Sequence, residues 1–153
     1  MRHLLFHQPE SFADAQEGAG EIDVKNLSPL LNRQLFQMGF AHTVECWRDG
    51  ALVGGLYGIS IGGAFFGESM FSTERDASKV ALVHLVVRLK RSGFLLLDTQ
   101  FVTPHLQHFG AIEISRPDYR QRLARAIAVP ARFQGEVSDD EVEGFLQSST
   151  QTS

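Results

Sequence analysis

The apolar positions of this chain change their spacing several times, and each change predicts a new element. Between residues 28 and 39, SPLLNRQLFQMG has helical spacing, with Ser28 suited to the N-cap and Gly39 to the end of the helix. Residues 42–71 then carry three apolar stretches of β type, separated by the turn sequences RDG and IGG. Because Asp-Gly and Gly-Gly tolerate the positive φ angles of tight turns, this part predicts an antiparallel meander.

The spacing becomes helical again after the meander. DASKVALVHLVVRLKRSG has Asp76 as a candidate N-cap, ends at Gly93 and is apolar over most of its circumference, which predicts a helix buried against a sheet. The remaining pattern predicts a strand, a short helix, a second strand and a final helix, at 94–101, 103–109, 111–114 and 116–128. Three antiparallel strands followed by alternating helices and strands indicate an α+β domain with a mixed sheet.

The composition agrees with one domain that has no membrane segment. The 153 residues are enough for one core, the chain has no long uncharged apolar run, and its N-terminus lacks the apolar stretch of a signal peptide. Cys46 is the single cysteine, which excludes an internal disulfide framework. Since free thiols suit a reducing compartment, we expect a cytoplasmic protein.

The net charge of −4 originates at the C-terminal end of the chain. Residues 136–153 contain five of the 18 acidic residues and no Lys or Arg, so the rest of the chain has 13 acidic against 14 basic residues. The overall charge therefore neither favours nor excludes a nucleic-acid partner. We expect a loosely ordered segment at 1–27, a folded domain at 28–132 and a disordered acidic tail at 133–153.

Two polar residues interrupt the buried strand predicted at 94–101. In FLLLDTQF, Asp98 and Gln100 are two residues apart, so both side chains lie on the same face of the strand. A buried carboxylate needs a partner, and these side chains could orient an amine or a carbonyl of a ligand at the strand end. The pair could equally form a strand-end cap on the following loop, and spacing alone favours that simpler interpretation.

A second carboxylate lies in a strand of aromatic residues. In FFGESMFS, a regular pleat would place Phe66, Glu68 and Met70 on one face. A carboxylate in such surroundings is a candidate for ligand binding, and the many glycines of the meander would let a ligand approach the backbone. Glu68 at a solvated edge is an equally good interpretation.

Other chemical signals are weak. The predicted helix 116–128 carries Arg116, Arg120, Arg122 and Arg125, which could contact phosphates but match an ordinary solvated surface at least as well. His105 and His108 lack a third ligand at a recognised spacing, so we predict no metal. The chain has no P-loop, no dinucleotide fingerprint and no nucleophile-elbow motif.

Five short motifs in order carry a resemblance to a known family. From about Gly39 to Leu123, the chain contains GGLYG, FFGESMFS, ASK at a helix start, LDTQF and FGAIEI followed by Arg. This region resembles the C-terminal domain of the leucyl/phenylalanyl-tRNA–protein transferases. The resemblance implies an acetyltransferase-like (GNAT) fold, which agrees with the predicted α+β order of meander, helix and strand. The glycine-rich pyrophosphate loop of ordinary acetyltransferases is not found before residue 76, which argues against acetyl-CoA as donor.

The resemblance implies an aminoacyltransferase that acts in the bacterial N-degron pathway. Its members transfer Leu or Phe from Leu-tRNA or Phe-tRNA to the N-terminal amine of proteins that begin with Arg or Lys, which marks them for degradation. The partners would therefore be an aminoacyl-tRNA and an acceptor protein. No cofactor is implied, and we expect a monomer.

The resemblance also implies roles for individual residues. Asp98 and Gln100 match the pair proposed to promote attack of the amine on the aminoacyl ester, although the ribose hydroxyl of the substrate is an alternative proton acceptor. Glu68 would help to receive the cationic end of the acceptor. The remaining implied substrate-binding residues are Ser72 and those near the apolar pocket for the Leu or Phe side chain, namely Leu56, Phe65, Leu85 and Leu97.

The N-terminal part of the chain differs from the family pattern. Full-length members carry an N-terminal domain with a tryptophan-rich segment that helps to hold the terminal adenosine of the tRNA, whereas this chain has one tryptophan, Trp47. We therefore expect a shortened member. Two rival hypotheses remain, a non-catalytic member that binds peptide N-termini or the tRNA end, and a small acyl-CoA transferase.

Overall fold

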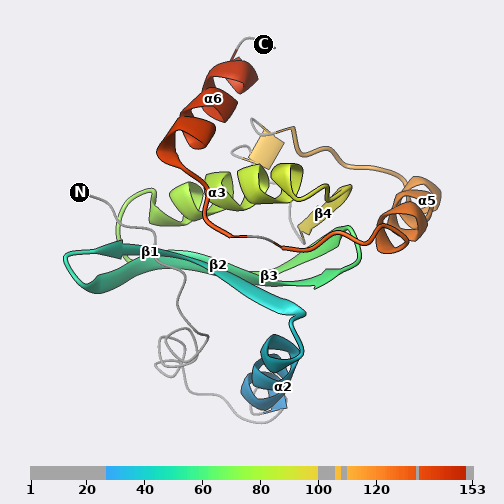
Figure 1. The fold of residues 1–153 in the computed structure, drawn as a ribbon, viewed down its shortest axis with the longest axis horizontal. Helices are drawn as coiled ribbons and strands as arrows, with labels where there is room; N and C mark the ends of the chain where they lie inside the picture. The colour runs from blue at the N-terminus through green and yellow to red at the C-terminus, as the bar shows by residue number, and fades with distance from the viewer. Residues whose placement is uncertain (1–26, 100–105, 108–109, 134, 151–153) are drawn as a thin grey trace.

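A computed structural model describes residues 27–99, 106–107, 110–133 and 135–150. Its centre is a four-stranded sheet with the strand order β1-β2-β3-β4. Figure 1 shows helix α3 along one face of this sheet, α2 on the other side, α6 on the outer side of α3, and α5 beside β4. The structure confirms the predicted α+β class with a mixed sheet flanked by helices.

The first three strands form the predicted meander. Strands β1 (Ala41–Arg48), β2 (Ala51–Ile61) and β3 (Ala64–Ser72) pair antiparallel in sequence order. The first turn places Asp49 and Gly50 at φ angles of 51° and 80°, and the second places Gly62 at 56°. These positive φ angles are the reason why both turns contain glycine.

Helix α2 (Leu27–Gln37) begins one residue before the predicted N-cap Ser28, and Gly39 follows its end with a φ angle of 79°. The helix contacts β1, and Asn32 Nδ2 donates to the Tyr57 hydroxyl of β2 at 3.3 Å. Because Tyr57 follows Leu56, which packs toward α3, α2 lies on the face of the sheet opposite α3.

Helix α3 (Ala77–Arg91) provides the main packing surface for the sheet. Asp76 precedes it as predicted, but its side chain makes no cap hydrogen bond, and its Oδ1 lies 2.7 Å from Lys79 Nζ. Gly93 follows the helix with a φ angle of 75°. The core between α3 and the sheet contains the buried side chains Val44, Cys46, Val53, Leu56, Phe65, Ala77, Ala81, Leu82, Leu85 and Leu89.

Strand β4 (Leu96–Thr99) pairs parallel with β3, which makes the sheet mixed. It covers part of the predicted strand 94–101, whereas Gln100 and residue 101 lie outside the described residues. The predicted strand 111–114 is wrong, because this segment is irregular and joins no sheet. Ile112 is 64% exposed and Glu113 is exposed, whereas Ala111 packs partly against the core, so burial in AIEI does not follow the alternation expected of a strand.

Helix α5 (Arg116–Ile127) matches the predicted helix closely. Its N-cap is Ser115, whose side chain accepts from the Asp118 backbone N–H, and Pro117 lies in the first turn. The C-terminal end contacts the β2–β3 turn, where Gly63 N–H donates to the Ala126 carbonyl at 2.8 Å. Helix α5 is therefore attached to the sheet next to the place where β3 and β4 pair.

Helix α6 (Asp139–Thr150) differs from the predicted disordered tail at 133–153. Val137, Val142 and Phe145 pack with Val83 and Val87 of α3 into a second apolar cluster. Helix α6 begins with a capping box, in which Ser138 N–H donates to Glu141 Oε2 at 2.9 Å and Glu141 N–H donates to Ser138 Oγ at 3.3 Å. The acidic composition concealed both the Ser-x-x-Glu signal and the apolar spacing.

The contact between α6 and α3 is testable with two neighbouring residues. We expect Phe145→Ala to lower the free energy of unfolding by about 2 kcal/mol, because Phe145 packs against α3 and lies under the Lys90 ammonium group. Leu146, which is 40% exposed, is the matched control, and Leu146→Ala should cost less than about 0.5 kcal/mol. Equal losses of unfolding free energy for the two variants, measured in urea, would contradict the packing of Phe145 against α3.

Candidate functional site

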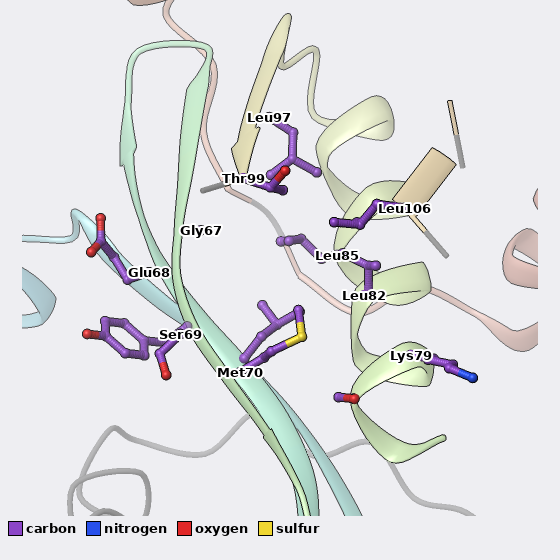
Figure 2. Close-up of a pocket in the computed structure, with 13 residues that line it drawn as sticks. Gly67, Glu68, Ser69, Met70, Lys79, Leu82, Leu85, Leu97, Thr99 and Leu106 are labelled. Carbon is purple, nitrogen blue, oxygen red and sulfur yellow. The ribbon is translucent and has the colours of Figure 1, made fainter. Parts of the chain in front are cut away.

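A cavity of about 270 Å³ opens between β3, β4 and α3. Strands β3 and β4 pair from Ala64 with Leu96 to Gly67 with Thr99, and the cavity lies where this pairing ends. Figure 2 shows apolar side chains from α3, β3 and β4 converging on the space between the strands and the helix. Its apolar wall consists of Leu56, Met70, Leu82, Leu85, Leu97 and Leu106.

A β-bulge in β3 shapes the cavity wall. Tyr57 pairs with Ser69 and the next residue, Gly58, pairs with Gly67, so Glu68 is an extra residue in β3. Met70 is thereby opposite Leu56 on the face toward α3, although a regular pleat would place it on the face of Phe66. The predicted common face of Phe66, Glu68 and Met70 is therefore wrong.

The bulge also determines where Glu68 points. Glu68 is exposed, and Figure 2 shows its carboxylate on the side of β3 away from α3. It nevertheless lines the cavity together with its neighbours, since Gly67, Glu68, Ser69 and Met70 all contribute to the wall. The structure thus places an exposed carboxylate at the border of an otherwise apolar cavity.

Three of the predicted apolar site residues line the cavity and one does not. Leu56, Leu85 and Leu97 belong to the wall. Phe65 is fully buried in the core behind it, where its ring lies 5.8 Å from the ring of Phe133. Phe65 therefore supports the wall from behind and does not contact the cavity.

Sequence reasoning missed several wall residues, of which Leu82 had a detectable signal. Leu82 precedes Leu85 by three residues, so both lie on the same face of α3. Met70 is part of the FFGESMFS motif, but the alternation of a regular strand predicts it on the face opposite the cavity. Leu106 lies beyond β4, in a part of the chain that local spacing does not connect with the wall.

Ser72 is not a wall residue. Its hydroxyl donates to the Glu74 carbonyl at 2.6 Å and accepts from the Ser78 backbone N–H at 3.3 Å. The Asp76 carboxylate lies beside the same helix start, paired with Lys79. These contacts place a hydroxyl and a negative charge at the N-terminus of α3. Because a bound phosphate group needs free N–H groups and no negative charge nearby, this helix start is unfavourable for phosphate binding.

Asp98 lies between two cavity residues but points to the other face of β4. Leu97 and Thr99 line the cavity, and side chains alternate along a strand. On its own face the Asp98 carboxylate meets α5, where the Tyr119 hydroxyl donates to Oδ2 at 2.5 Å. This hydrogen bond, together with burial and the negative charge of Asp98, raises the pKa of Tyr119 to about 12.

The predicted partner of Asp98 lies outside the described residues. Gln100 would share the face of Asp98 if the strand continued in the same way, and this placement stays a prediction. The observed partner, Tyr119, is 21 residues away in the sequence. Neither the spacing nor the quoted motifs contained a signal for this pair.

The arginines of α5 surround the solvent side of the helix. Arg116, Arg120, Arg122 and Arg125 are exposed, and none forms an ion pair with a carboxylate of the described residues. Tyr119, Leu123 and Ala126 turn inward. The side of α5 that faces solvent is therefore basic, next to the strand that carries Asp98.

Metal and membrane signals are lacking in the part of the chain that the structure describes. There, no three His, Cys, Asp or Glu side chains are grouped closely enough to hold a metal ion. No helix in the same ranges has the length and apolar character needed to cross a bilayer.

The motifs that surround this site decide the family. The family model described as "Leucyl/phenylalanyl-tRNA protein transferase" matches residues 29–124, which include most of α2, the meander, α3, β4 and most of α5. The chain belongs to this transferase family. The predicted family membership is thereby confirmed.

Curated relatives agree with this assignment. The leucyl/phenylalanyl-tRNA–protein transferase of Maricaulis maris is 61% identical over 143 residues, which are 92% of this chain and 65% of the relative. The transferase of Paramagnetospirillum magneticum is 66% identical over 130 residues, 80% of this chain and 62% of the relative. The transferase of Caulobacter vibrioides is 57% identical over 126 residues, 82% of this chain and 58% of the relative. The chain thus spans about three fifths of the length of these relatives.

Two solved acetyltransferases align with most of the chain at low identity. AAC(6')-Iy, solved with a bisubstrate analogue, aligns with 90% of this chain at a TM-score of 0.47 and 13% identity. A ribosomal-protein-alanine N-acetyltransferase from Brucella melitensis aligns with 90% of this chain at a TM-score of 0.43 and 16% identity.

Proposed function

We propose that this chain transfers Leu or Phe from aminoacyl-tRNA to the N-terminal amine of proteins that begin with Arg or Lys. The observation that carries the proposal is an apolar cavity whose wall residues Leu97 and Thr99 flank Asp98 in β4, in a chain of the leucyl/phenylalanyl-tRNA–protein transferase family. In this proposal the protein acts in the cytoplasm, where the transfer marks acceptor proteins for degradation.

The cavity supports an apolar amino-acid side chain as its occupant. Its volume of about 270 Å³ and its leucine and methionine wall suit a Leu or Phe side chain, which gains free energy by leaving water. A wall of this kind discriminates by apolar fit, at about 1–3 kcal/mol per methylene group. Leu97 and Thr99 of the wall flank Asp98 in β4, so in this proposal the aminoacyl ester extends from the cavity toward the face of Asp98.

In the proposed reaction, the amine nitrogen of the acceptor attacks the ester carbonyl of the aminoacyl-tRNA. An amide bond forms, the bond between the carbonyl carbon and the ribose oxygen breaks, and the amine loses one proton while the ribose oxygen gains one. Asp98 accepts a hydrogen bond from the attacking amine and orients it, with Gln100 as the predicted helper. Because an ester is exchanged for an amide, positioning and desolvation of the amine supply most of what the step needs.

Two charged features support the choice of partners. The exposed Glu68 carboxylate at the border of the cavity can receive the cationic side chain of an acceptor that begins with Arg or Lys. The exposed arginines of α5 offer positive charge to the phosphates of a tRNA. The crowded N-terminus of α3, with Ser72 and Asp76, argues against an acyl-CoA donor.

The test is transfer of radiolabelled leucine from leucyl-tRNA to two peptides that differ only in the first residue, Arg or Asp. We expect labelling of the Arg peptide and at least about tenfold less labelling of the Asp peptide, because only the former can pair with Glu68. Glu68→Gln should reduce this preference, with Glu143→Gln, an exposed carboxylate of α6, as the matched control.

The outcomes separate the rival hypotheses. Folded protein that binds leucyl-tRNA or the Arg peptide without transfer would establish a non-catalytic binding member of the family. Equal labelling of both peptides would retain the transferase and reject the role of Glu68. Labelling of the peptides from a radiolabelled acyl-CoA, without any transfer from leucyl-tRNA, would overturn the proposal.

A further inference from the structure

Among the residues that the structure describes, Tyr119 is the hydrogen-bond partner of the Asp98 carboxylate. Its hydroxyl donates to Oδ2 at 2.5 Å, while no hydrogen bond or ion pair joins Oδ1 to any part of the chain that the structure describes. A hydroxyl that donates to an ionised carboxylate over this distance forms a charge-assisted hydrogen bond, which is shorter and stronger than a neutral one. The two carboxylate oxygens of Asp98 therefore have different surroundings.

Tyr119 belongs to α5, which is held at both ends by contacts that do not involve Asp98. At its N-terminus, α5 is capped by Ser115, and at its C-terminus Gly63 N–H donates to the Ala126 carbonyl. Both contacts are independent of Asp98. The helix therefore holds the Tyr119 ring in place, and the ring in turn restricts the rotation of the Asp98 side chain.

We propose that Tyr119 is a positioning residue, which holds Oδ2 of Asp98 and thereby directs Oδ1 toward the incoming amine. This inference rests on the proposed function, because it assigns to Asp98 the role described there. A carboxylate with both oxygens free would rotate about its terminal torsion, which is broad for Asp. One fixed oxygen leaves one acceptor with a defined direction, and orientation of reacting groups contributes directly to rate.

The first experiment is steady-state transfer of leucine to the Arg peptide by Tyr119→Phe. We expect kcat to fall about tenfold while KM for both substrates changes less than about twofold, since the ring stays and only the hydroxyl is lost. Gln121→Ala, an exposed residue two positions along the same helix, is the control and should retain the wild-type kcat.

The decisive comparison adds Asp98→Asn. If Tyr119 acts through Asp98, then Tyr119→Phe should have an effect of less than about twofold in the Asp98→Asn protein, because the group that it orients is already changed. A merely structural role of the hydroxyl would instead give the same tenfold loss in both backgrounds. Additive losses would overturn the inference.

The hydrogen bond itself can be measured without the transfer reaction. The chain has two tyrosines, so Tyr57→Phe leaves Tyr119 as the single phenol. Its tyrosinate absorbance should then titrate near pH 12 and move toward pH 10 when Asp98 is also changed to Asn. Ordinary titration near pH 10 in both proteins would overturn the inference.

These readouts separate the two proposals. An active wild type with an unaffected Tyr119→Phe variant would reject the positioning role and retain the proposed transferase. A wild type without transfer would reject the proposed function and the positioning role that rests on it, while the phenol titration would still report whether the pair forms.

Discussion

Asp98→Asn should reduce leucine transfer to an Arg-initiated peptide by about 10²- to 10⁴-fold, which is the usual contribution of a positioned acid or base. The amide has nearly the same shape and can still accept from the Tyr119 hydroxyl, so the fold should be retained. It lacks the negative charge that attracts and orients the ammonium or amine of the acceptor. The loss should appear in the rate constant for transfer that is measured under single-turnover conditions.

The control for this experiment is Glu113→Gln, which removes an exposed carboxylate from the segment that leads to α5. We expect it to retain the wild-type rate. If Asp98→Asn transferred leucine at nearly the wild-type rate, the carboxylate would be dispensable. The alternative in which the ribose hydroxyl of the substrate takes the proton would then be the better mechanism.

Gly62→Ala should lower the free energy of unfolding by about 3 kcal/mol. Gly62 has a φ angle of 56°, and a Cβ atom there would lie 2.3 Å from the carbonyl oxygen of Ile127. The substitution therefore combines backbone strain with a collision against the C-terminal end of α5. Since the carbonyl belongs to backbone, relief requires movement of α5 away from the sheet.

Gly50→Ala isolates the two contributions to this loss. Gly50 has a φ angle of 80°, and nothing lies within 4 Å of a Cβ atom at that position. We expect it to cost only about 1–2 kcal/mol, which is the backbone strain alone. Equal losses for both variants in urea unfolding would show that the close contact between the β2–β3 turn and α5 has no energetic importance.

The parts of the fold that the sequence predicted well depend on local patterns. The meander turns needed positive φ angles and contained Gly50 and Gly62, and α5 had its cap and its proline within three residues of each other. The segment AIEI had the local pattern of a strand, but no sheet edge pairs with it. Strand formation requires a pairing partner, and that information is not local.

The candidate site was predictable in its residues and less so in its geometry. The family resemblance implied Asp98, Leu56, Leu85 and Leu97, and the last three line the cavity. The bulge at Glu68 could not be read from spacing, because one unpaired residue changes the face of every residue after it. The contact between Asp98 and Tyr119 joins two elements that only the folded chain brings together.

The alternation along β4 separates two properties of the protein at neighbouring positions. Leu97 and Thr99 belong to the cavity wall, while Asp98 between them meets α5 on the other face. Under the proposed function, a change of size at position 97 alters which amino acid fits without touching the carboxylate, and a change at position 98 does the reverse. In the proposed function, the fit of the donor side chain and the carboxylate therefore change independently, by single substitutions in one short strand.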